Sequence, residues 1–390
     1  MRWILVFLRE TVSLFVKKKR PPYSQFAVVD LFCGVGGLTH GFRQERFKVA
    51  AGIDFDETCG YAFKKNNKAP FLKEDVTKLA PQKLKSLYPK GSRRILVGCA
   101  PCQPFSLFNH KDDYEAVIKS DKDKWRLLYS FADLVESTKP EIVSMENVPQ
   151  LMKFKNGTVF KAFVNHLEKL GYTVSYGIYN AQDYGVPQRR KRLILFGSLH
   201  GKIEMIPPTH TEGNYVTVKD AISHLPRIRD GIAHPNDPLH RSRKLTPINK
   251  KRIMATKQGG GWQDWDESLI LECHKTESGK NFRSVYGRMS WDEVAPTMTT
   301  YCHGLGNGRF GHPTQNRVIT MREAAILQSF PEDYEFIDPK KGFNSTHIAR
   351  HIGNAVPVGL GKAIAKSIKK HIKSLNNGKS IRRKNTPLEV

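Results

Sequence analysis

Cys102 is the residue whose type and surroundings best suit a catalytic nucleophile. It lies in the stretch GCAPCQPFS, residues 98–106, directly after an apolar run at 95–97 that predicts a buried parallel strand. A cysteine between two prolines just past a strand end sits on a stiff loop at the carboxyl edge of a sheet. Open α/β sheets place their ligands at that edge. We therefore expect one working thiol there, Cys102.

The other cysteines leave two alternatives for this motif. The sequence has six cysteines, scattered rather than spaced as a disulfide framework, which predicts reduced thiols in an intracellular protein. Cys99 and Cys102 form a C-x-x-C pair, but a zinc site would need a second pair, and Cys273 and Cys302 are far apart. We expect no metal. A thioredoxin-like redox pair stays open, although Cys99 at a strand end also fits a small core residue.

An acid follows the next predicted strand. Residues 142–145 form an apolar run, and Glu146 comes directly after it. Adjacent strands lie about 5 Å apart, so Cys102 and Glu146 could reach one small planar ligand. Four basic residues, 189–192, precede a further apolar run at 193–196. They are either solvated charge or, beside a thiolate, groups that attract phosphate and lower the cysteine pKa.

The first strand and turn predict a Rossmann-like α/β unit. The apolar run at 26–31 leads into the glycine turn FCGVGG and then a helical stretch at 38–44. The third position of the dinucleotide fingerprint is Thr39, so the turn is not built to cradle a pyrophosphate. Asp54 ends the second strand, where such folds bind ribose hydroxyls, and Asp75 follows the third, within reach of an adenine amino group. Taken singly, each acid is more often a cap or a loop charge.

Charge and length indicate a nucleic-acid partner and more than one domain. The 390 residues suit a large α/β domain with a second, smaller one. A formal net charge of +26 indicates a polyanion, nucleic acid first. The apolar run at residues 3–8 is too short for a signal-peptide core or a membrane span. We expect a cytoplasmic, nucleoid-associated protein that does not bind a membrane.

Six motifs in order resemble the DNA (cytosine-5)-methyltransferases, of the bacterial restriction-modification type, over residues 26 to 372. They are DLFCGVGG at 30–37, the GCAPCQPFS stretch, ENV at 146–148, QRRKR at 188–192, REAA with LQSFP at 322–331, and GNAVP at 353–357. The resemblance implies a Rossmann-like methyltransferase domain with a smaller, mostly irregular or β target-recognition domain. It also implies S-adenosyl-L-methionine as cofactor, which fits a turn without the third glycine.

The helical and strand periodicity weakens after about Ser198, and this change together with the resemblance predicts a division into segments. These are an N-terminal extension (1–22), a catalytic and cofactor-binding domain (23–198), a target-recognition domain (199–330), a return to the catalytic domain (331–375) and a basic tail (376–390). Near the end of the target-recognition segment, Thr320 and Glu323 predict a capping box for a helix to about Ser329. An apolar stripe predicts a further helix from Val358 to about Leu375.

The matching motifs also imply roles for individual residues of the site. The resemblance implies Cys102 as the nucleophile and Glu146 as its acid partner, with Arg190 and Arg192 holding the target nucleotide. It implies cofactor contacts for a larger set, namely Phe32, Gly34, Gly36, Gly37, Asp54, Asp75, Val76, Pro101, Leu127, Asn354, Ala355 and Val356. A glutamate is more usual at position 54 in the family.

The chemistry of these residues is coherent. Carbon 5 of cytosine is a poor nucleophile, and a thiolate that adds to carbon 6 moves electron density onto carbon 5. A protonated Glu146 bonded to ring nitrogen 3 offsets the charge that develops. The base must flip out of the duplex, and the loop at 108–124 is our candidate for closing over it.

We therefore expect methyl transfer to carbon 5 of cytosine in a specific double-stranded DNA sequence, by a monomer paired genetically with a restriction endonuclease. A tRNA cytosine-5 methyltransferase of the same fold is one alternative, against which the recognition segment of over a hundred residues argues. A non-catalytic DNA-binding protein is another, but it would be expected to have lost Cys102 or Glu146.

Overall fold

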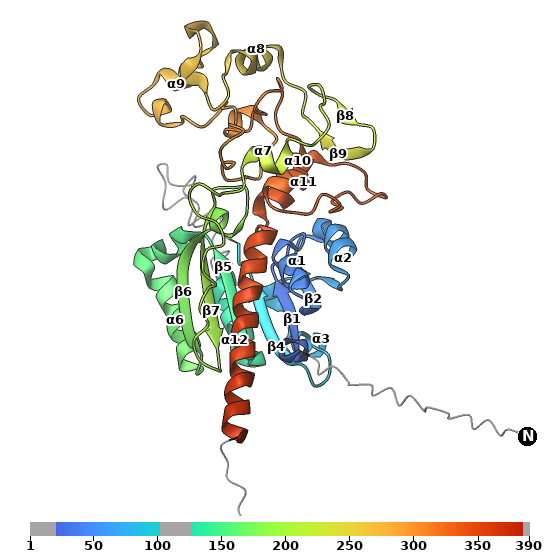
Figure 1. The fold of residues 1–390 in the computed structure, drawn as a ribbon, viewed down its shortest axis with the longest axis vertical. Coiled ribbons are helices and arrows are strands. Elements are labelled where there is room, and N and C mark those ends of the chain that lie inside the picture. Colours follow the sequence, from blue (N-terminus) through green and yellow to red (C-terminus); the bar gives the residue numbers. More distant parts are fainter. Residues whose placement is uncertain (1–20, 102–125, 385–390) are drawn as a thin grey trace, which may run out of the picture.

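The computed structural model describes residues 21–101 and 126–384, with side chains up to residue 375. The N-terminal residues 1–20, Cys102 and the loop expected to close at 108–124 lie outside the described residues. Figure 1 shows a larger lobe built on a β-sheet and a smaller lobe of loops and short helices. The long helix α12 (Val358–Lys384) runs along the sheet of the larger lobe.

The larger lobe holds a seven-stranded sheet in the order β3-β2-β1-β4-β5-β7-β6. Strands β1 to β5 are mutually parallel, and β7 runs antiparallel to both of its neighbours. The strands are β1 (Phe26–Leu31), β2 (Lys48–Asp54), β3 (Phe71–Lys73), β4 (Arg93–Gly98), β5 (Ile142–Asn147), β6 (Thr173–Asn180) and β7 (Lys191–Ser198).

Helices cover both faces of this sheet, which explains why its central strands read as continuous apolar runs. Every residue of β1 is buried. Phe26 and Val28 pack in a cluster with α1 and α12, whereas Ala27 and Val29 pack on the opposite face with α5 and α6. The helices of this lobe are α1 (Gly37–Gln44), α2 (Gly60–Asn67), α3 (Pro81–Leu87), α5 (Leu127–Thr138), α6 (Thr158–Lys169) and α12.

The smaller lobe is mostly irregular, as expected. Its one sheet among the described residues pairs β8 (Ala233–His234) with β9 (Asp237–Arg241). Short helices complete it, namely α7 (Val218–Ile222), α8 (Pro247–Ala255), α9 (Glu272–Lys275), α10 (Met321–Leu327) and α11 (Ser345–Asn354).

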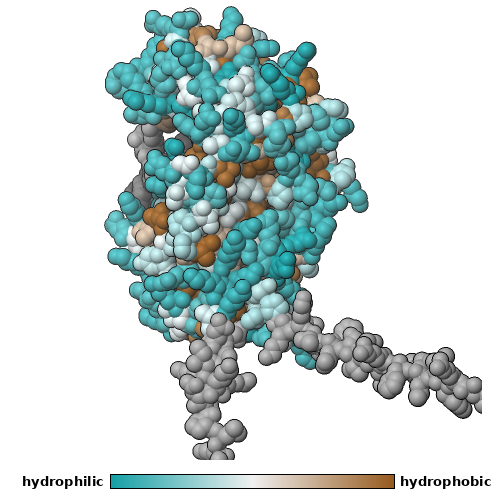
Figure 2. Space-filling model, in the orientation of Figure 1, coloured by the Kyte–Doolittle hydropathy of each residue, from teal (hydrophilic) through white to brown (hydrophobic). Residues whose placement is uncertain are grey.

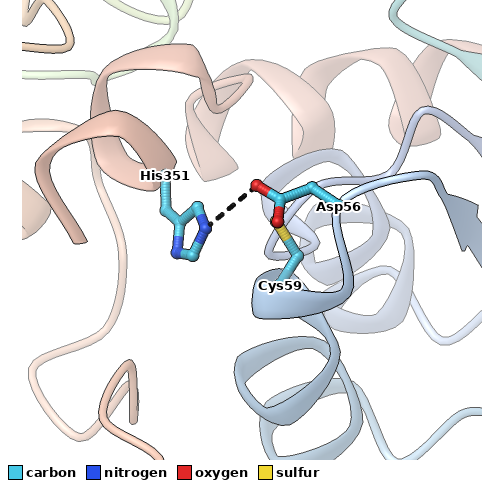
Figure 3. Close-up of side chains that lie close together, drawn as sticks. All are labelled: Asp56, Cys59 and His351. Carbon is cyan, nitrogen blue, oxygen red and sulfur yellow. Dashed lines mark ion pairs between the residues drawn. The ribbon is translucent and has the colours of Figure 1, made fainter. Parts of the chain in front are cut away.

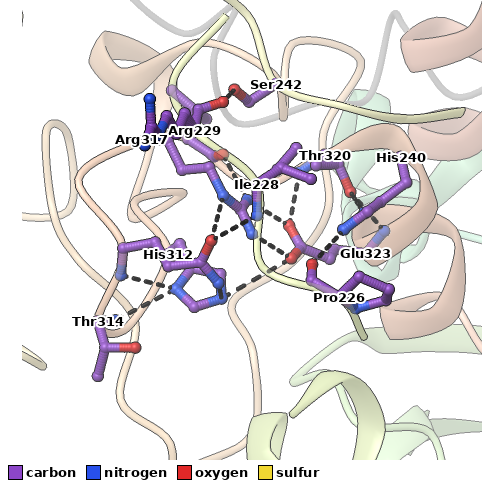
Figure 4. A network of polar contacts seen from close by, with 12 residues as sticks. Pro226, Ile228, Arg229, His240, Ser242, His312, Thr314, Arg317, Thr320 and Glu323 are labelled. Carbon is purple, nitrogen blue, oxygen red and sulfur yellow. Dashed lines mark hydrogen bonds and ion pairs between the residues drawn. The ribbon is translucent and has the colours of Figure 1, made fainter. Parts of the chain in front are cut away.

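Buried polar contacts replace regular structure as the framework of this lobe. Arg317 and Glu323 form an ion pair of 2.7 Å between fully buried side chains (Figure 4). The predicted capping box is confirmed, because the Thr320 hydroxyl accepts from the Glu323 amide and the Glu323 carboxylate accepts from the Thr320 amide. Glu323 thus joins a helix cap to a buried arginine.

Two features near the C-terminus differ from expectation. Residues 345–354 form helix α11, where no helix was predicted. Helix α12 continues to Lys384, nine residues past the predicted end at Leu375, so much of the expected basic tail is helical. The division into functional domains otherwise stays a prediction.

The surface is polar over the face drawn in Figure 2, where hydrophilic residues dominate both lobes. Within the described ranges, no helix combines the length and apolar character needed to cross a membrane.

Candidate active site

A cavity of about 880 Å³ opens at the carboxyl edge of β1, β2 and β4. Residues from both ends of the chain line it, because α11 and the segment leading to α12 return to this edge. Ten of the twelve predicted cofactor residues belong to the lining, namely Phe32, Gly34, Asp54, Asp75, Val76, Pro101, Leu127, Asn354, Ala355 and Val356.

Gly36 and Gly37 are the two that do not line the cavity, so their expected cofactor contact stays a prediction, and the structure shows a packing role for both. Gly36 precedes α1 with a φ of 91°, in the left-handed region that favours glycine. A Cβ on Gly37 would lie 2.2 Å from the carbonyl oxygen of Val356. The pair therefore brings the start of α1 against the segment that enters α12.

Asp54 holds the glycine turn in place. Its carboxylate accepts from the backbone amide of Gly34 at 2.8 Å and from that of Asp56 at 2.9 Å. Burial raises the pKa of Asp54, while these two amides oppose the shift. Asp75 has a similar local contact, because it accepts from the Thr77 amide at 2.9 Å. Both acids cap local turns and also line the cavity.

Several cavity residues were not among the predicted cofactor contacts, and two of them, Phe55 and Asp30, bear on ligand binding. Phe55 follows Asp54, lines the cavity and is 73% exposed, which offers a flat apolar surface to a ligand. Its only signal was an aromatic residue directly after the acid that ends a strand. Asp30 of the first motif also lines the cavity although it is fully buried.

Asp30 is electrostatically unusual. One carboxylate oxygen accepts from the Thr39 hydroxyl, and the other has no hydrogen-bond partner among the described residues. Burial raises the pKa of Asp30 to about 7, with a further contribution from the charge of Asp54. The cavity wall therefore carries a carboxyl group that titrates near neutral pH.

A group of Asp56, Cys59 and His351 lies at the cavity edge (Figure 3). These residue types can bind zinc. The Asp56 oxygens, however, already accept from the Arg350 guanidinium at 2.7 Å and from the Thr58 amide at 3.0 Å. We therefore interpret the group as a contact between α11 and the end of β2, and the absence of a metal stays a prediction.

Glu146 is held by both neighbouring strands. It lies near the end of β5 and is buried, with 3% of its side chain exposed. The Cys99 thiol lies 2.7 Å from its Oε2, and Arg192 Nε lies 3.0 Å from its Oε1. The next residue, Asn147, donates to the carbonyl oxygen of Ala100 at 3.1 Å. The acid and the segment that leads to Cys102 are thus tied together.

Comparison with known proteins decides the family. A family model described as C-5 cytosine-specific DNA methylase matches residues 26–370. The chain belongs to the C-5 cytosine-specific DNA methylases. It is a DNA (cytosine-5-)-methyltransferase, and the family implies S-adenosylmethionine as the methyl donor.

Individual relatives are similar over most of their length. The type II methylase M.HgiDII of Herpetosiphon aurantiacus is 49% identical over 356 residues, 91% of this chain and 98% of the relative. The type II methyltransferase M1.HphI of Haemophilus parahaemolyticus is 30% identical over 92% of this chain and 91% of its own. The crystal structure of a candidate DNA modification methyltransferase from an Escherichia coli prophage matches in fold. That match has a TM-score of 0.66 and 24% identity, covering 88% of this chain and 99% of the other.

The methylase's two site arginines lie in different environments. Arg192 faces Glu146. Arg190 is buried and donates to the carbonyl oxygens of Met298 at 2.9 Å, Gly353 at 3.0 Å and Ala355 at 3.3 Å. Its expected contact with the target nucleotide stays a prediction, and among the described residues the guanidinium has a positioning role, since it joins the smaller lobe to the segment before α12.

Proposed function

We propose that the chain is the modification methylase of a type II restriction-modification system. It methylates carbon 5 of one cytosine within a specific double-stranded DNA sequence and so protects that sequence from a partner endonuclease. The likeness to relatives named type II methylases, one of them 49% identical, supports this proposal. The observation that carries the chemistry is the Glu146 carboxyl held between β4 and β7, beside the cavity edge.

Cys102 is the proposed nucleophile. Its thiolate adds to carbon 6 of the flipped cytosine, which breaks the 5,6 double bond and places electron density on carbon 5. After carbon 5 has received the methyl group, its proton is lost to a base, the double bond re-forms and Cys102 leaves as thiolate. Cys102 itself lies outside the described residues, but it follows the Cys99–Pro101 segment that Asn147 anchors.

Glu146 is the proposed acid partner in this addition. A carboxyl group that donates to ring nitrogen 3 stabilises the negative charge which the thiolate brings into the ring. The carboxyl must already be fixed in place when the cytosine binds, because a donor that has to reorganise during the reaction stabilises the developing charge less. Arg192, bonded to one oxygen of Glu146, supplies part of that fixation and a positive charge at the base.

The cavity fits the implied methyl donor. It has an aromatic face at Phe55, acids at Asp54 and Asp75 that suit hydroxyl and amino groups, and a glycine turn at Gly34 that admits close approach. When bound, S-adenosylmethionine supplies an electrophilic methyl group. The residues of the chain bind and orient it at the strand edge that leads to Cys102.

The smaller lobe is the proposed DNA-reading part, and the net positive charge of the whole chain supports DNA binding. Residues 199–330 are short on regular structure and rich in loops, which is the form in which side chains reach base edges and phosphates. A net charge of +26 favours association with the DNA backbone and makes it depend on salt.

Expression in cells that lack cytosine methylation tests the proposal. Sequencing of their DNA is expected to find 5-methylcytosine at one position of one short recurring sequence. Cells that express the Cys102→Ala variant are the matched control, and their DNA is expected to stay unmethylated. A soluble wild-type protein that leaves the DNA unmethylated would refute the proposal, and methylation of RNA by that protein would favour the tRNA alternative.

A further inference from the structure

Cys99 lies on the same face of the sheet as Glu146, directly across from it. Strands β4 and β5 pair in parallel with Gly98 opposite Met145. Continuing that register by one residue puts Cys99 opposite Glu146. Ile95, Val97 and Cys99 pack in the same hydrophobic cluster as Ile142 of β5, as the alternation of side chains requires. The 2.7 Å contact between the thiol and Glu146 Oε2 thus follows from the sheet itself.

Arg192 reaches the same carboxyl from the other side. Strand β7 lies next to β5, and Ile194 stands opposite Glu146 in their antiparallel register. Arg192 precedes Ile194 by two residues, so its side chain emerges on the same face. The sheet order β4-β5-β7 therefore surrounds Glu146 with one donor from the residue that follows β4 and one from β7.

We infer that Cys99 is a positioning residue for Glu146 in methyl transfer. The terminal torsion of a glutamate is broad, so a carboxyl held through one oxygen still rotates about that bond. A thiol donating to Oε2 and a guanidinium donating to Oε1 fix both its plane and its direction. Each oxygen has a second acceptor position, which leaves room for the catalytic proton and the base. The inference rests on the proposed role of Glu146.

The first cysteine of the C-x-x-C pair thus has a role separate from that of Cys102. If Cys99 only filled space in the core, any small apolar side chain could replace it. A hydrogen-bond donor cannot be replaced in that way. Alanine at position 99 removes the donor, and serine keeps one in nearly the same place. The two substitutions therefore separate hydrogen bonding from packing.

The test compares Cys99→Ala, Cys99→Ser and Cys273→Ala in single-turnover methyl transfer with saturating DNA and S-adenosylmethionine. Cys273 is an exposed free thiol in the smaller lobe, so its removal controls for thiol loss. We expect Cys99→Ala to slow the step about tenfold, because the loss of one hydrogen bond leaves a buried carboxyl oxygen unsatisfied and its orientation unfixed. The dissociation constants for DNA and cofactor and the melting temperature should stay close to the wild-type values.

We expect Cys99→Ser to recover the rate to within about twofold of the wild type, and Cys273→Ala to leave it unchanged. An unimpaired Cys99→Ala protein would overturn the inference. So would alanine and serine variants that are equally slow, because packing rather than donation would then explain the loss.

A double-mutant cycle shows whether Cys99 acts through Glu146. If it does, adding Cys99→Ala to the slow Glu146→Gln protein should cost less than about twofold, because residues that act as a unit are not additive. The same tenfold cost in both backgrounds would refute the inference and leave the role of Glu146 intact. Normal turnover by Glu146→Gln alone would refute the proposed role of Glu146 and this inference with it.

Discussion

Replacement of Asp30 by asparagine should stabilise the protein, and by more at high pH than at low pH. The fully buried carboxyl has its pKa raised by burial from 3.8 to about 7. An acid with a raised pKa binds a proton in the folded state at pH values where the unfolded chain has released it. Its contribution to stability therefore falls as pH rises from about 4 to about 7, and is constant above that.

The size of the effect follows from the shift. Three pKa units correspond to about 4 kcal/mol of unfolding free energy, of which about 3 kcal/mol falls between pH 5 and pH 8. Asparagine cannot ionise and still offers an oxygen to the Thr39 hydroxyl. The stability of Asp30→Asn relative to wild type should therefore increase by about 3 kcal/mol over that interval.

Urea unfolding of both proteins at pH 5, 6, 7 and 8 measures this difference. Asp56→Asn is a comparison in which the pKa shift has the opposite sign. Hydrogen bonds from His351 and Thr58, and the charge of Arg350, lower the Asp56 pKa. That variant should be less stable than wild type at neutral pH, and its deficit should shrink only as pH falls below about 4. A difference for Asp30→Asn that stays within 1 kcal/mol from pH 5 to pH 8, or that narrows, would refute the reasoning.

Three further outcomes are expected. Phe55→Ala should weaken S-adenosylmethionine binding about tenfold in calorimetry. The stability of the unliganded protein should change little, because Phe55 is 73% exposed. Unchanged affinity would show that Phe55 does not contact the cofactor. Arg190→Ala should cost about 3 kcal/mol in urea unfolding, because buried carbonyls lose their donor. A stable variant with weakened DNA binding would support the predicted nucleotide contact instead. DNA affinity should fall at least tenfold between 50 and 200 mM salt in fluorescence titration, and a flat response would contradict the role given to the net charge.

The strands were predictable because the sheet is covered on both faces. A run such as 26–31 is apolar at every position but one, and its ends coincide with those of β1. Helix α11 was missed although Asn344 caps it and Ile348 and Ile352 share a face. Its ten residues contain two histidines and an arginine, and the glycine at 353 reads as the start of a loop. Tertiary contacts, here Arg350 with Asp56, stabilise a helix whose own pattern is weak.

The two arginines mark the limit of reading a site from motifs. Arg190 and Arg192 are two residues apart and of one type, so their spacing alone predicts a shared face. Arg190 precedes β7, however, and strand alternation does not extend to it. The backbone carbonyls that accept from it come from residues more than a hundred positions later in the chain. No local pattern contains those partners.

The reversed direction of β7 explains how an arginine reaches the acid at all. The cavity opens at the carboxyl ends of β1, β2 and β4, and Glu146 lies near the carboxyl end of β5, the next parallel strand. A parallel strand beside β5 would bring its last residues to that edge, and the loop before it would lie at the opposite edge. Because β7 is antiparallel, its first residues arrive there, and Arg192 is the second of them. The basic run before β7 is therefore close to Glu146 by topology, which is why one of its members can share the carboxyl with Cys99.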